Sequence, residues 1–231
     1  MKILAACLLG WITSMACAAA PRYTTVRVDV QKEHLELFWG DDAGKPLHRH
    51  SRLASWLSAR GRHLRFAMNA GMYHADFTPV GVYVNNSQAW IAPNLASGTG
   101  NFFLKPNGVF FVNDAGAHIV ESSEYPALSV GVRLATQSGP LLVRHGVIHP
   151  RFDAHSTSRK IRNAVGVSGG EVIFAISDTP VTFFEMALYF RDVLNCADAL
   201  YLDGTVSSLY SDELRRNDDN ADLGPIIGVT D

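Results

Sequence analysis

Short polar clusters stand at the ends of apolar runs at five places along this chain of 231 residues. Their side chains offer amides, hydroxyls, an imidazole, a guanidinium and a carboxylate, which together could bind an anion and move a proton. Taken singly, each cluster has a simpler explanation, because Asn-Gly, Ser-Gly-Pro and Asp-Gly sequences also shape turns. The clusters are Asn69–His74, Pro106–Phe110, Gln137–Leu141, Arg162–Gly166 and Leu202–Ser208.

Common motifs of nucleotide-binding and zinc-dependent proteins are absent from the sequence. There is no G-x-x-x-x-G-K-[ST] loop, no G-x-G-x-x-G fingerprint and no H-E-x-x-H motif. The nine histidines show no paired metal-ligand spacing, since His48 and His50 are only two residues apart. We therefore predict no metal centre and no cofactor, and a divalent cation held by Asp, Asn and backbone oxygens stays open. Cys196 is predicted to be a buried thiol.

The clusters taken together resemble the phosphodiester glycosidase family, whose members include an animal enzyme that removes N-acetylglucosamine from mannose 6-phosphate tags. The family pattern runs Asn-Gly-Gly/Ala-aromatic, Asn-Gly, Ser-Gly-Pro, Arg-x-Ala-x-Gly, a Thr-x-x-Glu helix and Leu-Asp-Gly-Gly-x-Ser-Ser. This order is kept from Asn69 to Ser208. The segments Met68–Tyr73 and Asn101–Phe110 are similar to those of small exported bacterial members. The pattern is broken at Thr205, which stands where the family has its second glycine.

The resemblance implies a hydrolase that cleaves a sugar 1-phosphodiester, and the chemistry of that reaction suggests the catalytic residues. Phosphate leaves as an anion, so the site must bind phosphate, stabilise an oxocarbenium-like sugar and activate water. Asp203 is the predicted carboxylate beside the anomeric carbon, with Asp178 as a reserve acid or base and His74 as a further candidate for proton transfer. Glu185 also matches a family position, but a capping box with Thr182 explains it better.

Substrate binding is assigned to the remaining polar residues of the clusters. Arg162 is predicted to bind phosphate together with the Ser138 hydroxyl and the Gly139 backbone, because an Arg fork suits that anion. Asn69 and Asn107 are predicted either to donate to sugar hydroxyls or to organise loops. The full predicted substrate-binding set is Arg162, Asn69, Asn107, Ser138, Gly139, Gly204, Ser207 and Ser208.

An alternative hypothesis keeps the fold without the catalysis. Thr205 could alter the site, because a β-branched residue does not easily replace a glycine that adopts positive φ or lies close to a ligand. The chain would then be a glycan- or envelope-binding protein that binds a saccharide and releases no product.

Secondary-structure patterns indicate which elements position these clusters. Residues 64–167 break into short apolar runs separated by turn residues, which is typical of sheet structure. Alternation before and after Gln31–Glu33 predicts an antiparallel hairpin, and Asn163–Val167 with Glu171–Ser177 predicts a second one. Helical spacing is present at Ser51–Arg60.

The C-terminal third predicts a helix followed by a strand that leads to Asp203. Thr182 begins a helix of three to four turns, and Ala199–Leu202 is a buried strand. The fold class is therefore predicted as α+β, with a single domain over residues 21–231 that has mixed, largely antiparallel sheets and a few helices.

The first twenty residues predict a secretory signal peptide. Lys2 is followed by an apolar run and by small residues up to Ala20, a pattern typical of a cleaved leader. Acylation of Cys17 is less favoured, because Ser14 occupies the position where a lipoprotein signal has an aliphatic residue. We therefore predict a periplasmic or secreted protein.

Charge and hydropathy restrict the partners. Without residues 1–20 the chain has 19 basic and 22 acidic residues, a net charge of -3. We expect no nucleic-acid partner and no stable membrane insertion, and the expected partner is a phosphorylated glycan, small or polymeric. The oligomeric state stays open.

Overall fold

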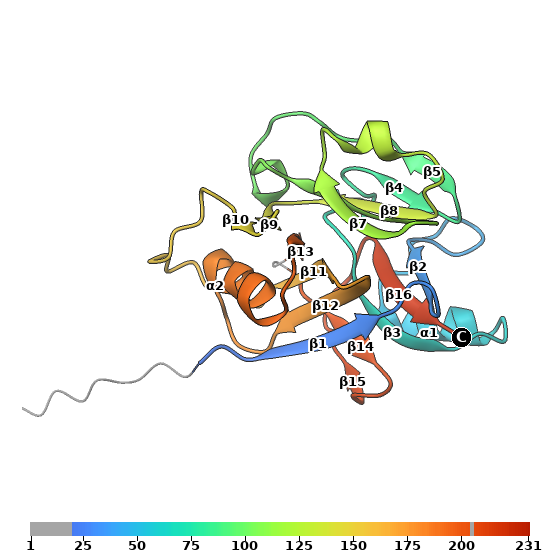
Figure 1. Cartoon of the computed structure of the whole chain (residues 1–231). Helices are drawn as coiled ribbons and strands as arrows, with labels where there is room; N and C mark the ends of the chain where they lie inside the picture. Colours follow the sequence, from blue (N-terminus) through green and yellow to red (C-terminus); the bar gives the residue numbers. More distant parts are fainter. Residues whose placement is uncertain (1–19, 204–205) are drawn as a thin grey trace, which may run out of the picture.

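The computed structural model describes residues 20–203 and 206–231, and the strands in these ranges form three antiparallel sheets (Figure 1). The first sheet has the order β1 (Tyr23–Val28), β12 (Glu171–Ser177), β11 (Asn163–Ser168), β13 (Asp198–Asp203), β9 (Leu141–Arg144) and β10 (Val147–Ile148). The second has the order β15 (Arg216–Asn217), β14 (Leu209–Ser211), β3 (Leu64–Asn69), β16 (Ile226–Thr230) and β2 (His34–Phe38). The third has the order β5 (Gln88–Ile91), β4 (Tyr83–Asn85), β8 (Leu134–Ser138), β6 (Gly108–Asn113) and β7 (Gly116–Glu121).

The three sheets share one main core, to which each contributes an aromatic ring. Phe174 of β12 lies with its ring centroid 5.1 Å from that of Phe66 in β3 and 6.3 Å from that of Phe110 in β6. The core residues of these strands alternate, as Val172, Phe174 and Ile176 do in β12, so one face of each sheet is apolar and points inward. Burial of this shared face is what holds the sheets together.

The outer face of each sheet is covered by a different element. The helix α2 (Phe183–Leu188) packs on the first sheet, and α1 (His50–Ser58) buries Leu53 and Leu57 against the second. Tyr125, in the 3-10 turn Tyr125–Leu128, packs on the third. Because both faces of β12 are covered, its sequence is a nearly continuous apolar run without polar alternation.

The capping box at the start of α2 is confirmed. The Thr182 hydroxyl accepts a hydrogen bond from the Glu185 backbone N–H at 3.1 Å, and the Glu185 carboxylate accepts from the Thr182 N–H at 2.8 Å. Glu185 also forms an ion pair with Arg159 at 2.6 Å. The α-helix ends at Leu188, where a π-helical turn at Tyr189–Val193 continues it.

The structure confirms the buried thiol and the hairpin between β11 and β12. Cys196 is 1% exposed, and burial raises the pKa of its thiol to about 11. The strands β11 and β12 pair in antiparallel register from Asn163 opposite Ile176 to Ser168 opposite Glu171.

The predicted N-terminal hairpin is wrong. Strand β1 pairs with β12 in the first sheet, whereas β2 pairs with β16 in the second, so the chain changes sheets at the Asp29–Glu33 turn. Val28 and Leu35 still enter the same core. Alternation specifies which face of a strand is buried but does not specify its partner strand, and this is why the sequence pattern misled.

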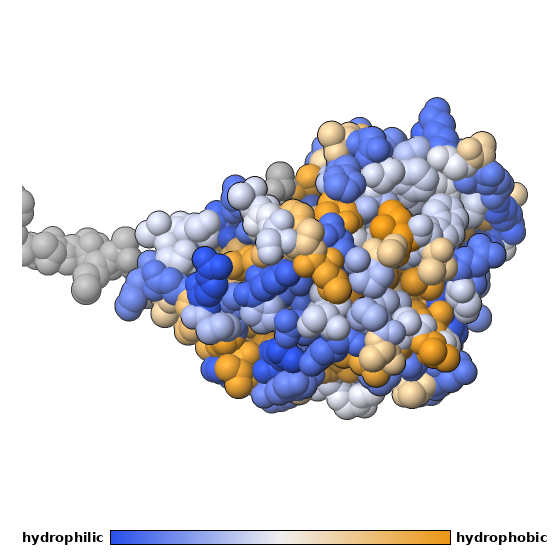
Figure 2. All heavy atoms as spheres, turned by 90° about the horizontal axis from the view of Figure 1, so that it is seen from above, coloured by the Kyte–Doolittle hydropathy of each residue, from blue (hydrophilic) through white to orange (hydrophobic). Residues whose placement is uncertain are grey.

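Hydrophilic residues are interspersed with smaller hydrophobic groups on the face seen in Figure 2. Large apolar side chains that are exposed include Trp90 and Val130. Among the described residues, no helix has the length and apolar character that a membrane span requires.

Candidate functional site

Several predicted clusters converge where strands of the three sheets end. Asp203 is the last residue of β13, and it lies opposite Asn163 at the start of β11. Asn69 ends β3 in the second sheet, and Ser208 immediately precedes β14. In the third sheet, Ser138 ends β8 and its hydroxyl donates to the Leu202 carbonyl at 2.8 Å. Residues far apart in the sequence thus meet around the end of β13.

Asn69 and Asn163 form a buried amide pair between the first and second sheets. Asn163 Nδ2 donates to Asn69 Oδ1 at 2.8 Å, and Asn69 Nδ2 donates to Asn163 Oδ1 at 3.3 Å. Asn163 Oδ1 also accepts from the Asp203 backbone N–H at 3.0 Å, and Asn69 Oδ1 accepts from the Ser208 N–H at 3.0 Å. Both side chains are fully buried. Of the two roles predicted for Asn69, the structure therefore supports loop organisation.

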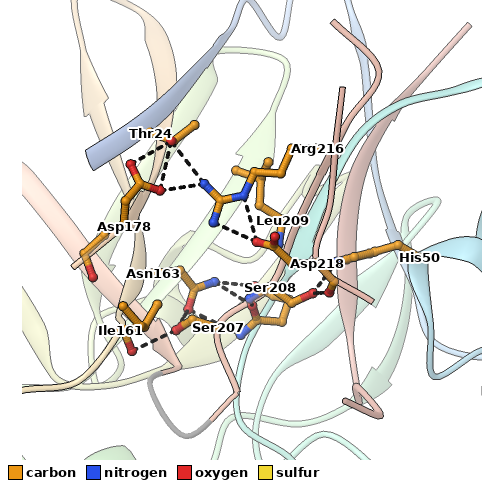
Figure 3. A network of polar contacts seen from close by, with 12 residues as sticks. Thr24, His50, Ile161, Asn163, Asp178, Ser207, Ser208, Leu209, Arg216 and Asp218 are labelled. Atoms are coloured by element: carbon orange, nitrogen blue, oxygen red, sulfur yellow. Dashed lines mark hydrogen bonds and ion pairs between the residues drawn. The ribbon is translucent and has the colours of Figure 1, made fainter. Parts of the chain in front are cut away.

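Ser207 and Ser208 form further hydrogen bonds around the buried amide pair (Figure 3). The Ser207 hydroxyl contacts the carbonyls of Asp203 at 3.0 Å and Ile161 at 3.2 Å. The Ser208 hydroxyl donates to the Asp218 carbonyl and accepts from His50 Nε2 at 2.9 Å. The backbone N–H groups of Asp203 and Ser208 are therefore both held by the buried amide pair.

The Asp203 carboxylate acts electrostatically on two tyrosines. Burial raises the pKa of Tyr201, the Arg162 guanidinium lowers it, and Asp203 raises it. Burial also raises the pKa of Tyr73, and Asp203 and then Asp222 add to this. Such effects act over short distances, so Asp203 and Arg162 share one neighbourhood around Tyr201. Asp203 is buried but retains 8% exposure, whereas Asn69 and Asn163 are fully buried.

The guanidinium of Arg162 is buried and bound to protein groups. Its nitrogens donate to the Val181 carbonyl at 2.9 Å, the Ser158 carbonyl at 3.1 Å and the Tyr201 hydroxyl at 3.3 Å. Its guanidinium carbon lies 3.8 Å from the centre of the Phe183 ring. These contacts use three of the five guanidinium N–H groups, and the side chain is 2% exposed, so burial limits the access of a phosphate to this fork.

Ser138, Gly139 and Asn107 form a tightly packed neighbouring group. Asn107 is buried, and its Nδ2 donates to the Phe102 carbonyl at 2.8 Å. A Cβ atom added at Gly139 would lie 2.6 Å from Asn107 Cβ and 2.8 Å from the Phe102 oxygen, so only glycine fits there. The Ser138 side chain is fully buried. The bond from Asn107 to the Phe102 carbonyl is a contact within the loop, as expected for a loop-organising side chain.

The other two residues of the predicted catalytic set have their own hydrogen-bond partners. Asp178 follows β12, where it accepts from the Thr24 hydroxyl at 2.9 Å and forms an ion pair with Arg216 at 2.6 Å. His74 is exposed at the tip of a loop, where its backbone N–H donates to the Thr78 carbonyl at 2.8 Å. Gly204, with Thr205, lies outside the described residues.

The sequence Gly166–Gly170 matches the G-x-S-x-G pattern of nucleophilic serines, but it lies in the hairpin between β11 and β12. The Ser168 hydroxyl donates to the Asn195 carbonyl at 2.9 Å. A nucleophile elbow requires a turn from a strand into a helix, so this match has no catalytic context.

Sequence reasoning missed Asn163 and His50 as site residues. Asn163 lies within one of the polar clusters, between two positions of the family pattern, and this position was the available signal. His50 is 158 residues from Ser208, and no local pattern connects them. Its ring must donate from Nε2, because the single Ser208 hydroxyl proton is given to the Asp218 carbonyl. Nδ1 has no hydrogen-bond partner among the described residues.

His50 should make stability depend on pH in acid. Burial lowers its pKa from 6.5 to about 4. Between these values the unfolded chain binds a proton that the folded chain does not, so the free energy of unfolding falls as the pH falls. The full effect is roughly 3 kcal/mol. Urea unfolding at pH 7, 6 and 5 should show this slope in the wild type and a flatter one in His50→Gln; equal slopes would contradict it.

Among the described residues, no group of three or more His, Cys, Asp or Glu side chains is placed to hold a metal ion. The arrangement places Asp203, through its backbone N–H, on a pair of buried amides, and its carboxylate acts electrostatically on Tyr201 and Tyr73. Such a group can stabilise positive charge or accept a proton.

Comparisons with known proteins agree on the family. The family model "Phosphodiester glycosidase" matches residues 62–230. The chain is 37% identical over 198 residues to the uncharacterized protein YigE of Escherichia coli (strain K12), covering 84% of this chain and 77% of that protein.

Two solved structures share the fold. The catalytic domain of zebrafish N-acetylglucosamine-1-phosphodiester alpha-N-acetylglucosaminidase, auto-inhibited by its pro-peptide, has a TM-score of 0.61 at 12% identity. That match covers 94% of this chain and 85% of the zebrafish chain. A hypothetical protein from Synechocystis has a TM-score of 0.53 at 16% identity, covering 90% of this chain and 59% of the other. With a family match over most of its length, the chain belongs to the phosphodiester glycosidase family.

Proposed function

We propose that this chain is an exported hydrolase that cleaves the bond between a sugar and the phosphate of a sugar 1-phosphodiester, with Asp203 as its catalytic carboxylate. The observation that carries the proposal is the placement of Asp203 at the end of β13, where buried amides hold the backbone on both sides of the following segment. Membership of the phosphodiester glycosidase family supports this reaction class.

In the proposed reaction the bond between the anomeric carbon and the phosphate oxygen breaks. The bonding electrons leave with the phosphate, and positive charge develops on the sugar ring. Asp203 stabilises that charge, and water supplies the oxygen that forms the new bond to carbon. The products are a free sugar and a phosphate monoester. Phosphate is a good leaving group, so the reaction needs no strong acid on the leaving side.

The sugar and the compartment are proposed on separate grounds. The zebrafish enzyme is named for N-acetylglucosamine, and this supports a hexose derivative as the sugar without deciding which one. The leader pattern in residues 1–20 supports export, so a phosphorylated glycan outside the cytoplasm is the proposed substrate.

The test is turnover by purified residues 21–231 of a panel of sugar 1-phosphate alkyl and aryl diesters in heavy-oxygen water. The expected result is a free sugar that carries the heavy oxygen, together with an unlabelled phosphate monoester. Label in the phosphate would mean cleavage of the phosphorus–oxygen bond and would contradict the proposal. Saturable binding of a saccharide with no product would favour the alternative of a glycan-binding protein.

A further inference from the structure

Arg216 links the first and second sheets beside the site (Figure 3). It lies on β15 in the second sheet, and its Nη1 reaches Asp178 at 2.6 Å and the Thr24 hydroxyl at 3.1 Å in the first. Its Nε and Nη2 both contact Asp218 Oδ2 at 2.8 Å. One guanidinium therefore joins a carboxylate that follows β12 to a carboxylate that follows β15.

Asp218 connects Arg216 to Ser208 and Leu209 by hydrogen bonds. Its carbonyl accepts the Ser208 hydroxyl, and its Oδ2 accepts the Leu209 backbone N–H at 3.3 Å. Ser208 is the end of that segment, and its own N–H is held by Asn69. A shift of Asp218 would therefore act on Ser208 and, through Asn69 and Asn163, on the backbone of Asp203.

The geometry points to Arg216 as a positioning residue for Ser208 through Asp218. The buried Asn69–Asn163 pair connects Ser208 in turn to the backbone of Asp203. The catalytic readout of this inference rests on the proposed function. Asp178, predicted as a reserve acid or base, would then have a structural role, because its carboxylate holds the Arg216 guanidinium from the side of the first sheet.

A positioning role differs from a purely stabilising one in its expected consequences. The side chains of Arg216, Asp178 and Asp218 are 24%, 29% and 27% exposed, and ion pairs this accessible to solvent contribute little to stability. A small displacement of a catalytic segment, by contrast, lowers turnover strongly. Loss of Arg216 should therefore reduce kcat much more than it reduces stability.

The test compares Arg216→Gln and Arg216→Lys with Arg27→Gln. Arg27 pairs with Glu171 at 2.9 Å toward the opposite end of β1 and β12, so it is a matched cross-strand ion pair away from the site. Arg216→Gln should lower kcat by about 10- to 100-fold with KM little changed. Arg216→Lys, which keeps the charge but not the fork, should recover part of kcat, and Arg27→Gln should resemble the wild type.

A second readout does not depend on activity. Hydrogen exchange of a peptide covering residues 206–211 should become faster in Arg216→Gln and stay unchanged in Arg27→Gln. Faster exchange in a protein that turns over no sugar phosphodiester would overturn the proposed function and leave the positioning link standing. Unchanged exchange, unchanged kcat, or a loss of kcat that follows a matching loss of thermal stability would overturn the positioning role.

Discussion

Asp203→Asn should lower kcat for a sugar 1-phosphodiester on the order of 10³-fold. Asparagine keeps the size of the side chain and the backbone N–H that donates to Asn163, but it removes the negative charge. A neutral amide neither stabilises an oxocarbenium-like sugar nor accepts a proton from water. The measurement is steady-state kinetics on the substrate found in the panel of diesters.

The matched control for this variant is Asp198→Asn, at the other end of the same strand. Asp198 accepts the His145 backbone N–H at 2.9 Å and lies away from the buried amide pair. This variant should keep a near wild-type kcat. Thermal unfolding of both proteins shows whether the fold is retained. A folded Asp203→Asn protein with wild-type turnover would remove Asp203 from the mechanism.

Asn163→Ala should destabilise the protein by about 3 kcal/mol and abolish most activity. The change leaves the Asp203 N–H and the Asn69 side chain without their buried partners, and an unpaired buried polar group carries its full desolvation cost. Urea unfolding gives the stability, and kinetics on the folded protein give the activity.

A double-mutant cycle that combines Asn163→Ala with Asn69→Ala measures the interaction free energy between the two side chains. Because each side chain bonds the other and one end of the Asp203–Ser208 segment, the two losses should be non-additive by about 1 kcal/mol or more. The control cycle combines Asn163→Ala with Asn113→Ala, because the Asn113 side chain contacts Ala115 and His118 at the β6–β7 turn. The losses in this control cycle should add. Losses that are equally additive for Asn163→Ala and Asn69→Ala would argue against the amide pair as the organiser of the site.

Local sequence signals predicted those features that depend on neighbouring residues. The capping box of Thr182 and Glu185 is complete within four residues, so sequence alone places it. The β11–β12 hairpin is equally local, because its Ser168–Gly170 turn joins two runs that pair directly. The clusters marked Asp203 and Ser208 for the same reason, as polar residues next to a buried strand.

Predictions that needed a partner from elsewhere in the chain fared less well. The N-terminal hairpin failed because alternation in β1 and β2 fits any partner with a matching apolar face. His50 reaches Ser208 only because α1 packs on the second sheet, and Asp178 meets Arg216 only because β15 lies beside the end of β12. Neither contact produces a periodic pattern of residues in the sequence.

Side-chain periodicity and turn chemistry over a few residues were enough to predict the strand-rich α+β class, the capped helix and the buried thiol. The order of polar clusters from Asn69 to Ser208 came from the resemblance to the family. The burial of Arg162, the hydrogen bonds of Asn163 and Asn69 to the backbones of Asp203 and Ser208, and the ion pair of Asp178 became known from the tertiary structure. The physical reason is that hydrogen bonding and burial depend on which strand ends meet, and strand pairing is a property of the whole chain.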